Sequence, residues 1–434
     1  MALFAKLRHS RFVQNVAKIS TGKLAAIAVS ILATPVISRL FDPSDYGVAA
    51  LFIALSTILG STIGLAYERA VIFPKSEALA NRVLVLSILI SILVAGLIFA
   101  LIVLVSFVWP EWLENQGLGV YIFVVPLGAL LMAMRGTVGS LCLRREDFSA
   151  IATADVSEAI VSTSTRVLWG IVLASSVSGL ILGHVLGIVV SLAICGSRSL
   201  TWFKKEYHSA SIADLRKVAY EFRDYPIFRA PARIALTASR RMPVVALGIL
   251  FSPEIVGFYA MASRAAALPL QTISKSVSNV LLRRTMGFKH EGRPLRNDLQ
   301  KVAAVLALTG LPVFSVMFFF GEEVLSWFLG ARWRSAGEIV EILAPFLFVI
   351  WASSFAPTVF ETLRLNKLRL KLHSLNLVLQ IALFAICGFL GIGTHETLWL
   401  FVAVSCFYQT IVYVVAFREV VKHDEGMSII KAGE

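Results

Sequence analysis

The sequence predicts an all-α integral membrane protein with about twelve transmembrane helices in two parallel six-helix repeats. Three observations lead to this prediction. Of the 434 residues, 57% are hydrophobic and only 15% are charged, whereas a soluble domain carries roughly 25% charged residues. The apolar residues form runs of about twenty, the length that a helix needs to cross the hydrocarbon core. Lys and Arg are concentrated in alternate connections between these runs.

The predicted spans fall into two sets of six. The first set lies at 17–38, 46–66, 83–108, 118–142, 150–174 and 177–198. After a polar break, the second set lies at 226–250, 255–280, 299–320, 336–360, 370–392 and 396–417. We therefore expect an N-terminal six-helix lobe (1–198), a basic cytoplasmic linker (199–225), and a C-terminal lobe of six helices with a cytoplasmic tail (226–434).

The distribution of Lys and Arg orients these spans. Alternate connections, beginning with the N-terminal segment, contain 28 of the 40 Lys and Arg residues, whereas the opposite set contains only Arg39, Arg332 and Arg334. Because positive residues stay on the cytoplasmic side during insertion, both ends of the chain are predicted to be cytoplasmic. The first apolar run has no A-x-A cleavage signal, which predicts an uncleaved span. The net charge of +13 is thus explained by the positive residues of the cytoplasmic connections, which also attract anionic lipid head groups. It does not indicate nucleic-acid binding.

A repeated segment relates the two halves. FDPSDYGVAA (41–50) aligns with FSPEIVGFYA (251–260), and the two share Phe, Pro, Gly and Ala at a constant offset of 210 residues. The same offset pairs Lys23 with Arg233. Because each half has an even number of spans, the repeats have the same orientation, and a site at their interface would be central.

Nine cations fall inside the predicted spans, where each central charge costs ~2.5–3.5 kcal/mol on insertion scales. They are Lys23, Arg135, Arg166, Arg229, Arg233, Arg240, Arg241, Arg264 and Lys275. Arg229, Arg233 and Arg240 share one helical face, and a cationic stripe on lipid is untenable. We therefore predict a central cationic cavity for an anion, phosphate or diphosphate matching Arg best. Its proposed lining is Lys23, Arg233, Arg240, Arg241 and Arg264.

Asp155 and Glu158 are the clear acids within the spans, on one face of 150–174 together with Arg166. Two roles stay open for these three residues. They could form an internal ion pair that positions the helix, or they could bind H⁺ or Na⁺ and couple transport to an ion gradient. The nearby His184 lies among Gly179, Gly183 and Gly187, whose spacing favours close helix packing.

The sequence lacks the motifs of catalysis and cofactor binding. It has no G-x-x-x-x-G-K-[ST] loop and no H-E-x-x-H, G-x-S-x-G or C-x-x-C pattern. The four cysteines lie in apolar runs and are interpreted as small buried hydrophobic residues. We therefore expect a transporter rather than an enzyme, with no cofactor and no metal.

Two N-terminal segments, SRLFDPSDYGVAALF (38–52) and YERAVIFPKSEALANRV (67–83), carry a family resemblance. They resemble the signature of Wzx-type polysaccharide and O-antigen flippases, in the multidrug/oligosaccharidyl-lipid/polysaccharide (MOP) exporter superfamily. That signature is an Arg, an apolar-Pro-acid-Tyr-Gly turn, a Glu-x-Ala-Ile/Val motif and a Pro-Lys loop. The matching positions here are Arg39, Phe41, Pro43, Asp45, Tyr46, Gly47, Glu68, Ala70, Val71, Pro74 and Lys75.

The resemblance implies a V-shaped bundle in the bacterial inner membrane that moves undecaprenyl-diphosphate-linked oligosaccharide units from the cytoplasmic to the periplasmic leaflet. It also implies alternating access and a role in O-antigen, lipopolysaccharide, capsule or exopolysaccharide assembly, beside polymerase and chain-length proteins. One alternative is a multidrug/cation antiporter of the same superfamily, whose cavity should be acidic. A membrane-embedded glycan polymerase would need a large external loop, and a non-catalytic partner in an assembly complex would leave the buried charges unexplained.

Overall fold

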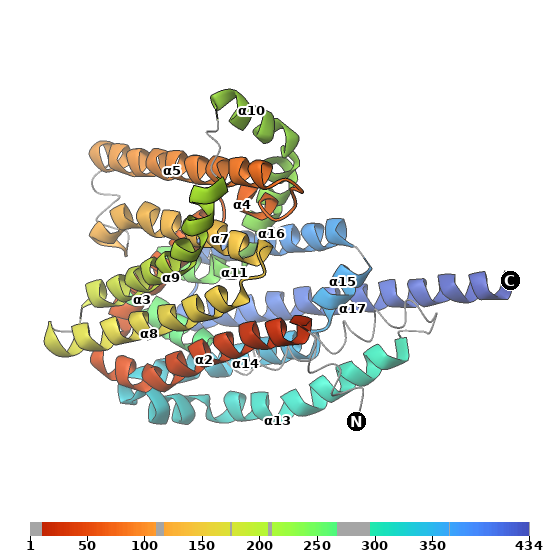
Figure 1. Cartoon of the computed structure of the whole chain (residues 1–434). Helices are drawn as coiled ribbons and strands as arrows, with labels where there is room; N and C mark the ends of the chain where they lie inside the picture. The colour runs from red at the N-terminus through yellow and green to blue at the C-terminus, as the bar shows by residue number, and fades with distance from the viewer. Residues whose placement is uncertain are drawn as a thin grey trace. The chain divides into compact units, whose positions relative to one another are not determined.

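The computed structural model describes residues 11–109, 117–173, 176–206, 211–266, 296–363 and 365–433 (Figure 1). These residues form helices joined by short turns, and no strand occurs among them. The chain divides into two compact units, 1–256 and 257–434. The predicted all-α class is therefore confirmed for the described residues.

The first unit is built from long helices that are joined by short helices and helical turns. In chain order they are α2 (Arg11–Leu40), α3 (Pro43–Gly60), α4 (Tyr67–Ala70), α5 (Glu77–Val108), the 3₁₀ turn η1 (Gly119–Val124), α7 (Val125–Arg144), α8 (Phe148–Val172), α9 (Val177–Glu206), α10 (Ile212–Glu221), the π-helical turn η2 (Tyr225–Arg229) and α11 (Ala230–Leu250). The α8 helix packs between α2 and α9, while α3 packs on α7 and α11. The α11 helix is thereby grouped with the first unit, whereas the proposed division into lobes at 199–225 stays a prediction.

The boundary between the units falls within a helical segment at 253–266, and the second unit begins at Gly257. Its helices are α13 (Arg296–Leu329), η3 (Ala331–Trp333), α14 (Arg334–Ala352), α15 (Ala356–Thr362), α16 (Asn366–Leu390) and α17 (Thr394–Gly433). The α14 helix packs against α13 and α17. Trp351 is fully buried there, and its Nε1 donates a 2.7 Å hydrogen bond to the carbonyl oxygen of Leu306.

Nine helical segments in the described ranges are long and apolar enough to cross a membrane. Two more helices, α8 with 25 residues and α11 with 21, contain charged residues but extend about 37 and 31 Å at 1.5 Å per residue. Both lengths match a hydrocarbon core of about 30 Å. Eleven of the twelve predicted spans thus coincide with described helices, and most of the span predicted at 255–280, including Lys275, lies outside the described residues.

The surfaces of these helices are suited to lipid. Phe107 of α5, Phe389 of α16 and Leu32 of α2 are 82%, 91% and 77% exposed. Such extensive apolar exposure would be unfavourable in water, whereas hydrocarbon accommodates it. The exposed faces and the number of spans agree that the chain is a multi-pass membrane protein.

Candidate functional site

An unusual turn follows α3 and places an acidic residue in the interior of the first unit. Leu65 and Ala66 adopt the left-handed conformation, with φ of 47° and 62°. Non-glycine residues rarely adopt this conformation, and each instance costs about 1–3 kcal/mol. The short helix α4 begins directly afterwards, and its Glu68 is only 5% exposed. Backbone strain at the end of α3 is therefore associated with a buried carboxylate.

Glu68 forms an ion pair with Arg233 of α11. Small polar residues line the other side of the carboxylate. A Cβ atom added at Gly64 would lie 3.1 Å from Glu68 Oε2 and 3.3 Å from the hydroxyl of Ser91. That hydroxyl donates to the carbonyl oxygen of Ser87, 2.7 Å away. The acid of the Glu-x-Ala motif therefore lies in a small polar site closed by an arginine.

The pairing changes the interpretation of Arg233. Glu68 falls in the connection between the predicted spans 46–66 and 83–108, on the predicted cytoplasmic side, so the sequence suggested no intramembrane counter-ion for Arg233. In the structure, the Arg233 side chain is 31% exposed and that of Glu68 only 7%. A buried ion pair offsets much of the desolvation cost of both charges. Arg233 therefore contributes less net positive charge to an anion site than its sequence position suggested.

The other predicted anion-binding residues differ in the accessibility of their side chains. Arg240 is exposed and Arg241 half-buried on α11, so the helix brings them together with Arg233. Lys23 on α2 and Arg264 in the helical segment 253–266 are also exposed. Arg264 belongs to the second unit, and the convergence of all five residues on one cavity stays a prediction.

A second polar cluster joins α7, α8 and α9. Arg135 Nη2 of α7 lies 2.8 Å from Asp155 Oδ1 of α8, and its Nε donates to the hydroxyl of Ser191 on α9. Glu158 lies within hydrogen-bonding reach of the same serine. Asp155 thus pairs with a cation from a neighbouring helix and not with Arg166, which lies eleven residues further, about 16 Å along α8. The structure thus adds Arg135 as a partner of Asp155, and the roles considered for Asp155, Glu158 and Arg166 stay predictions.

The crossing of α8 and α9 depends on the glycines of α9. A Cβ atom at Gly183 would lie 2.7 Å from Arg166 Cγ and 2.8 Å from the carbonyl oxygen of Ser162. The adjacent His184 packs edge-on against Phe52, with ring centroids 6.5 Å apart. The predicted packing role of the small-xxx-small spacing is confirmed, and Arg166 lies along this crossing.

Arg144 is a structural residue that the sequence analysis missed. Its guanidinium donates to the carbonyl oxygens of Val71, Ile72 and Pro74 and lies 3.0 Å from Glu77 Oε1. It therefore holds the Pro-Lys turn that follows the Glu-x-Ala motif. In the sequence, Arg144 is one of two adjacent arginines in a basic connection, and nothing there distinguishes it.

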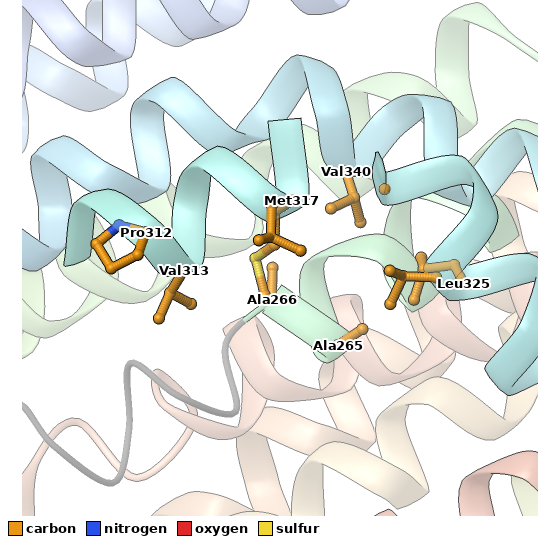
Figure 2. Close-up of a pocket in the computed structure, with 10 residues that line it drawn as sticks. Ala265, Ala266, Pro312, Val313, Met317, Leu325 and Val340 are labelled. Carbon is orange, nitrogen blue, oxygen red and sulfur yellow. The ribbon is translucent and has the colours of Figure 1, made fainter. Parts of the chain in front are cut away.

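One described pocket in the second unit, with a volume of about 410 Å³, is apolar (Figure 2). It lies among the segment 253–266, α13 and α14, where Figure 2 shows Met317 close to Ala266. None of its lining residues is charged, although Ala265 directly follows Arg264 in the chain. This pocket has no groups that could bind an anion, so the candidate anion site rests on the α11 arginines.

Comparison with known proteins places these features in a family context. A family model described as "Polysaccharide biosynthesis protein" matches residues 36–338, well over half of the chain. The match includes the N-terminal motifs, the Glu68–Arg233 pair and the arginines of α11. No curated protein matches the sequence.

Solved transporter structures share the fold. The lipid II flippase MurJ, in an inward closed conformation, matches with a TM-score of 0.68 and 13% identity over 97% of this chain and 93% of that chain. An inward-facing multidrug resistance MATE family transporter of the MOP superfamily matches with a TM-score of 0.60 and 13% identity, over 94% and 95%. A MOP superfamily transporter from Pyrococcus furiosus, described as having a binding pocket of reverse polarity, matches with a TM-score of 0.54 and 14% identity, over 95% and 96%. The chain therefore has the MOP transporter fold, which confirms the resemblance seen in its motifs.

Proposed function

We propose, since the chain belongs to the polysaccharide biosynthesis protein family, that it is a flippase for oligosaccharide units linked to undecaprenyl diphosphate. The proposed transport runs from the cytoplasmic to the periplasmic leaflet of the bacterial inner membrane. The product would enter assembly of lipopolysaccharide O-antigen, capsule or exopolysaccharide. Polymerase and chain-length proteins are the proposed partners, and both chain ends are proposed to be cytoplasmic.

The observation that carries this proposal is the group of three arginines on α11, of which Arg233 is paired with Glu68. Arg240 and Arg241 follow Arg233 by seven and eight residues, about two helical turns further along α11. Guanidinium groups bind phosphate oxygens through two parallel, charge-assisted hydrogen bonds. A lipid-linked diphosphate supplies this chemistry and can keep its hydrocarbon tail in the bilayer while the polar head crosses.

The Glu68–Arg233 pair suggests how a diphosphate would be admitted. The Glu68 carboxylate occupies one side of Arg233. An incoming phosphate could share Arg233 with Glu68, whereas complete replacement would leave the buried carboxylate without a counter-ion. Arg240, Arg241, Lys23 and Arg264 are the proposed additional ligands.

The Arg135–Asp155 pair and Glu158 are the proposed ion-coupling group. Three helices meet at this cluster, so a change in the charge of either acid would alter contacts among α7, α8 and α9. Arg166 remains part of the proposal through its position at the α8–α9 crossing. H⁺ and Na⁺ are the two candidate coupling ions.

A multidrug/cation antiporter is the second candidate function, because MATE family transporters share the fold. An organic cation requires acidic groups facing the transport path. The described acids Glu68 and Asp155 are each paired with an arginine. The charge arrangement therefore favours an anionic cargo.

The double substitution of Arg240 and Arg241 by Gln tests the proposed function. Each lost charge-assisted contact is worth about 1.5–3 kcal/mol, so we expect flipping of the undecaprenyl-diphosphate-linked substrate in proteoliposomes to fall at least 10-fold. Cells that carry only this variant should lose surface polysaccharide while retaining the protein in the membrane. A matched control replaces Lys367 and Lys371, two exposed cations of α16, by Gln. Full flipping by the Arg240/Arg241 variant would refute the assignment, and loss of cationic-drug export instead would favour the antiporter.

A further inference from the structure

The α10 helix is held firmly against the first unit by one of its faces. Val218 is 2% exposed and belongs to a core cluster that includes residues of α4 and α5. The hydroxyl of Tyr67 also donates a 3.2 Å hydrogen bond to the carbonyl oxygen of Ala219. In Figure 1, α10 lies beside one end of α5, in agreement with their contacts. Its orientation on the first unit is therefore fixed, and its remaining faces point in defined directions.

The N-terminus of α10 is stabilised by a capping box. The hydroxyl of Ser211 accepts from the backbone N–H of Asp214 at 3.1 Å, and the Asp214 carboxylate accepts from the N–H of Ser211 at 3.3 Å. The Ser211 hydroxyl also lowers the pKa of Asp214 below its ordinary value. Asp214 is therefore charged at neutral pH and lies 3.7 Å from Arg82 of α5.

The residues of α10 that lie off its packed face form two groups of different chemistry, and the exposed Lys217 lies between them. Ile212, Arg216 and Tyr220 are spaced by four residues and therefore share one face of α10, and Arg223 follows the end of the helix by two residues. Ile212 is 85% exposed and Tyr220 is 69% exposed, while the guanidinium of Arg223 lies 4.5 Å from the centroid of the Tyr220 ring. We call these four residues the basic-apolar face. The acids Asp214 and Glu221 lie half a turn away from it.

We propose that the basic-apolar face of α10 docks on a bilayer surface rich in anionic phospholipid. Apolar and aromatic side chains between arginines are typical of helices that lie in the head-group region, and two arginines complement anionic head groups. The acids, which such lipids would repel, are on the other side of the helix. Arg82 adds a counter-charge to Asp214.

The connections of α10 support this location. The helix begins six residues after α9 ends at Glu206 and ends four residues before η2 begins at Tyr225. The α9 helix is a candidate membrane span, so α10 is tethered close to a membrane surface. The inference depends on the membrane location of the chain and is independent of the cargo proposed above.

A fluorescent label on either side of α10 tests the inference in the full-length protein. Ile212 and Glu221 are both exposed and are nine residues apart, which places them on opposite sides of the helix. An environment-sensitive fluorophore is attached at Ile212→Cys or, as the matched control, at Glu221→Cys. Each protein is reconstituted in nanodiscs of phosphatidylcholine alone or of an equimolar mixture with phosphatidylglycerol. Acrylamide serves as quencher because it is neutral and is not repelled by anionic lipid.

We expect quenching of the label at position 212 to fall severalfold in the phosphatidylglycerol bilayer, while the label at 221 stays accessible in both. Adding Arg216→Gln and Arg223→Gln should restore quenching at 212, because each interfacial cation strengthens docking about fivefold. The native chain, treated with the same reagent, gives the background from the four native cysteines.

Three outcomes would overturn the inference. Equal, strong quenching at 212 in both bilayers would show that the face is in water. Equal protection in both bilayers would show insertion that does not depend on anionic lipid. Protection that persists in detergent would show that protein covers the face.

Discussion

Replacing Glu68 by Gln should destabilise the protein by leaving Arg233 without its counter-ion. Removal of one partner from a buried ion pair costs about 3–5 kcal/mol. Because the Arg233 side chain is 31% exposed, water recovers part of this loss, and we expect a cost of about 2–3 kcal/mol. For a unit of this size, that corresponds to a fall in Tm of about 4–12 °C.

A double-mutant cycle separates the ion pair from other effects of the substitution. Thermal unfolding of the purified full-length protein is compared for Glu68→Gln, Arg233→Gln and the double variant, with the exposed Glu361→Gln as a control for loss of an acid. The double variant should be less destabilised than the two single variants added together, because removing both charges leaves none isolated. Additive losses, or an unchanged Tm for Glu68→Gln, would refute the ion-pair argument.

Three further predictions concern the helix packing of the first unit. Asp155→Asn should lower Tm, and the additional change Arg135→Gln should recover part of the loss; strictly additive effects would contradict the pairing. Gly183→Ala should destabilise because its Cβ would approach the neighbouring helix to 2.7 Å, whereas Gly196→Ala on the same helix α9 meets nothing within 4 Å and should be neutral or stabilising by up to about 1 kcal/mol; equal Tm values would contradict this. Arg144→Gln should expose the turn that it holds to trypsin, and an unchanged digestion pattern would show that the turn does not depend on this residue.

Hydropathy and charge distribution were sufficient to predict the fold. Long apolar runs identified most spans directly, because few other structures can bury so many apolar residues. The α8 and α11 helices contain charged residues that weaken this signal. Both helices were still predicted as spans, because their other residues are mostly apolar over the roughly 20 residues that a membrane span needs. The alternation of Lys and Arg also required an even number of spans in each half.

The partners of the buried charges could not be predicted from the sequence. Glu68 enters the interior because Leu65 and Ala66 adopt a left-handed conformation, and neither residue type signals such a turn. Arg135 and Asp155 meet across two helices, so their pairing depends on how far each helix is rotated about its axis. Spacing within one helix predicted which residues share a face, but it contained no information about which residue of a neighbouring helix would be opposite.

The distance in sequence between Glu68 and Arg233 has a consequence for biosynthesis. A ribosome that adds about 5–20 residues per second needs roughly 8–33 s to proceed from the first residue to the second. During that interval the ion pair between Glu68 and Arg233 cannot form. The strain of the left-handed turn that buries Glu68 is therefore not yet offset by that pair. The end of α3 can therefore reach its final structure only after α11 has been made, although α3 itself is among the earliest helices to leave the ribosome.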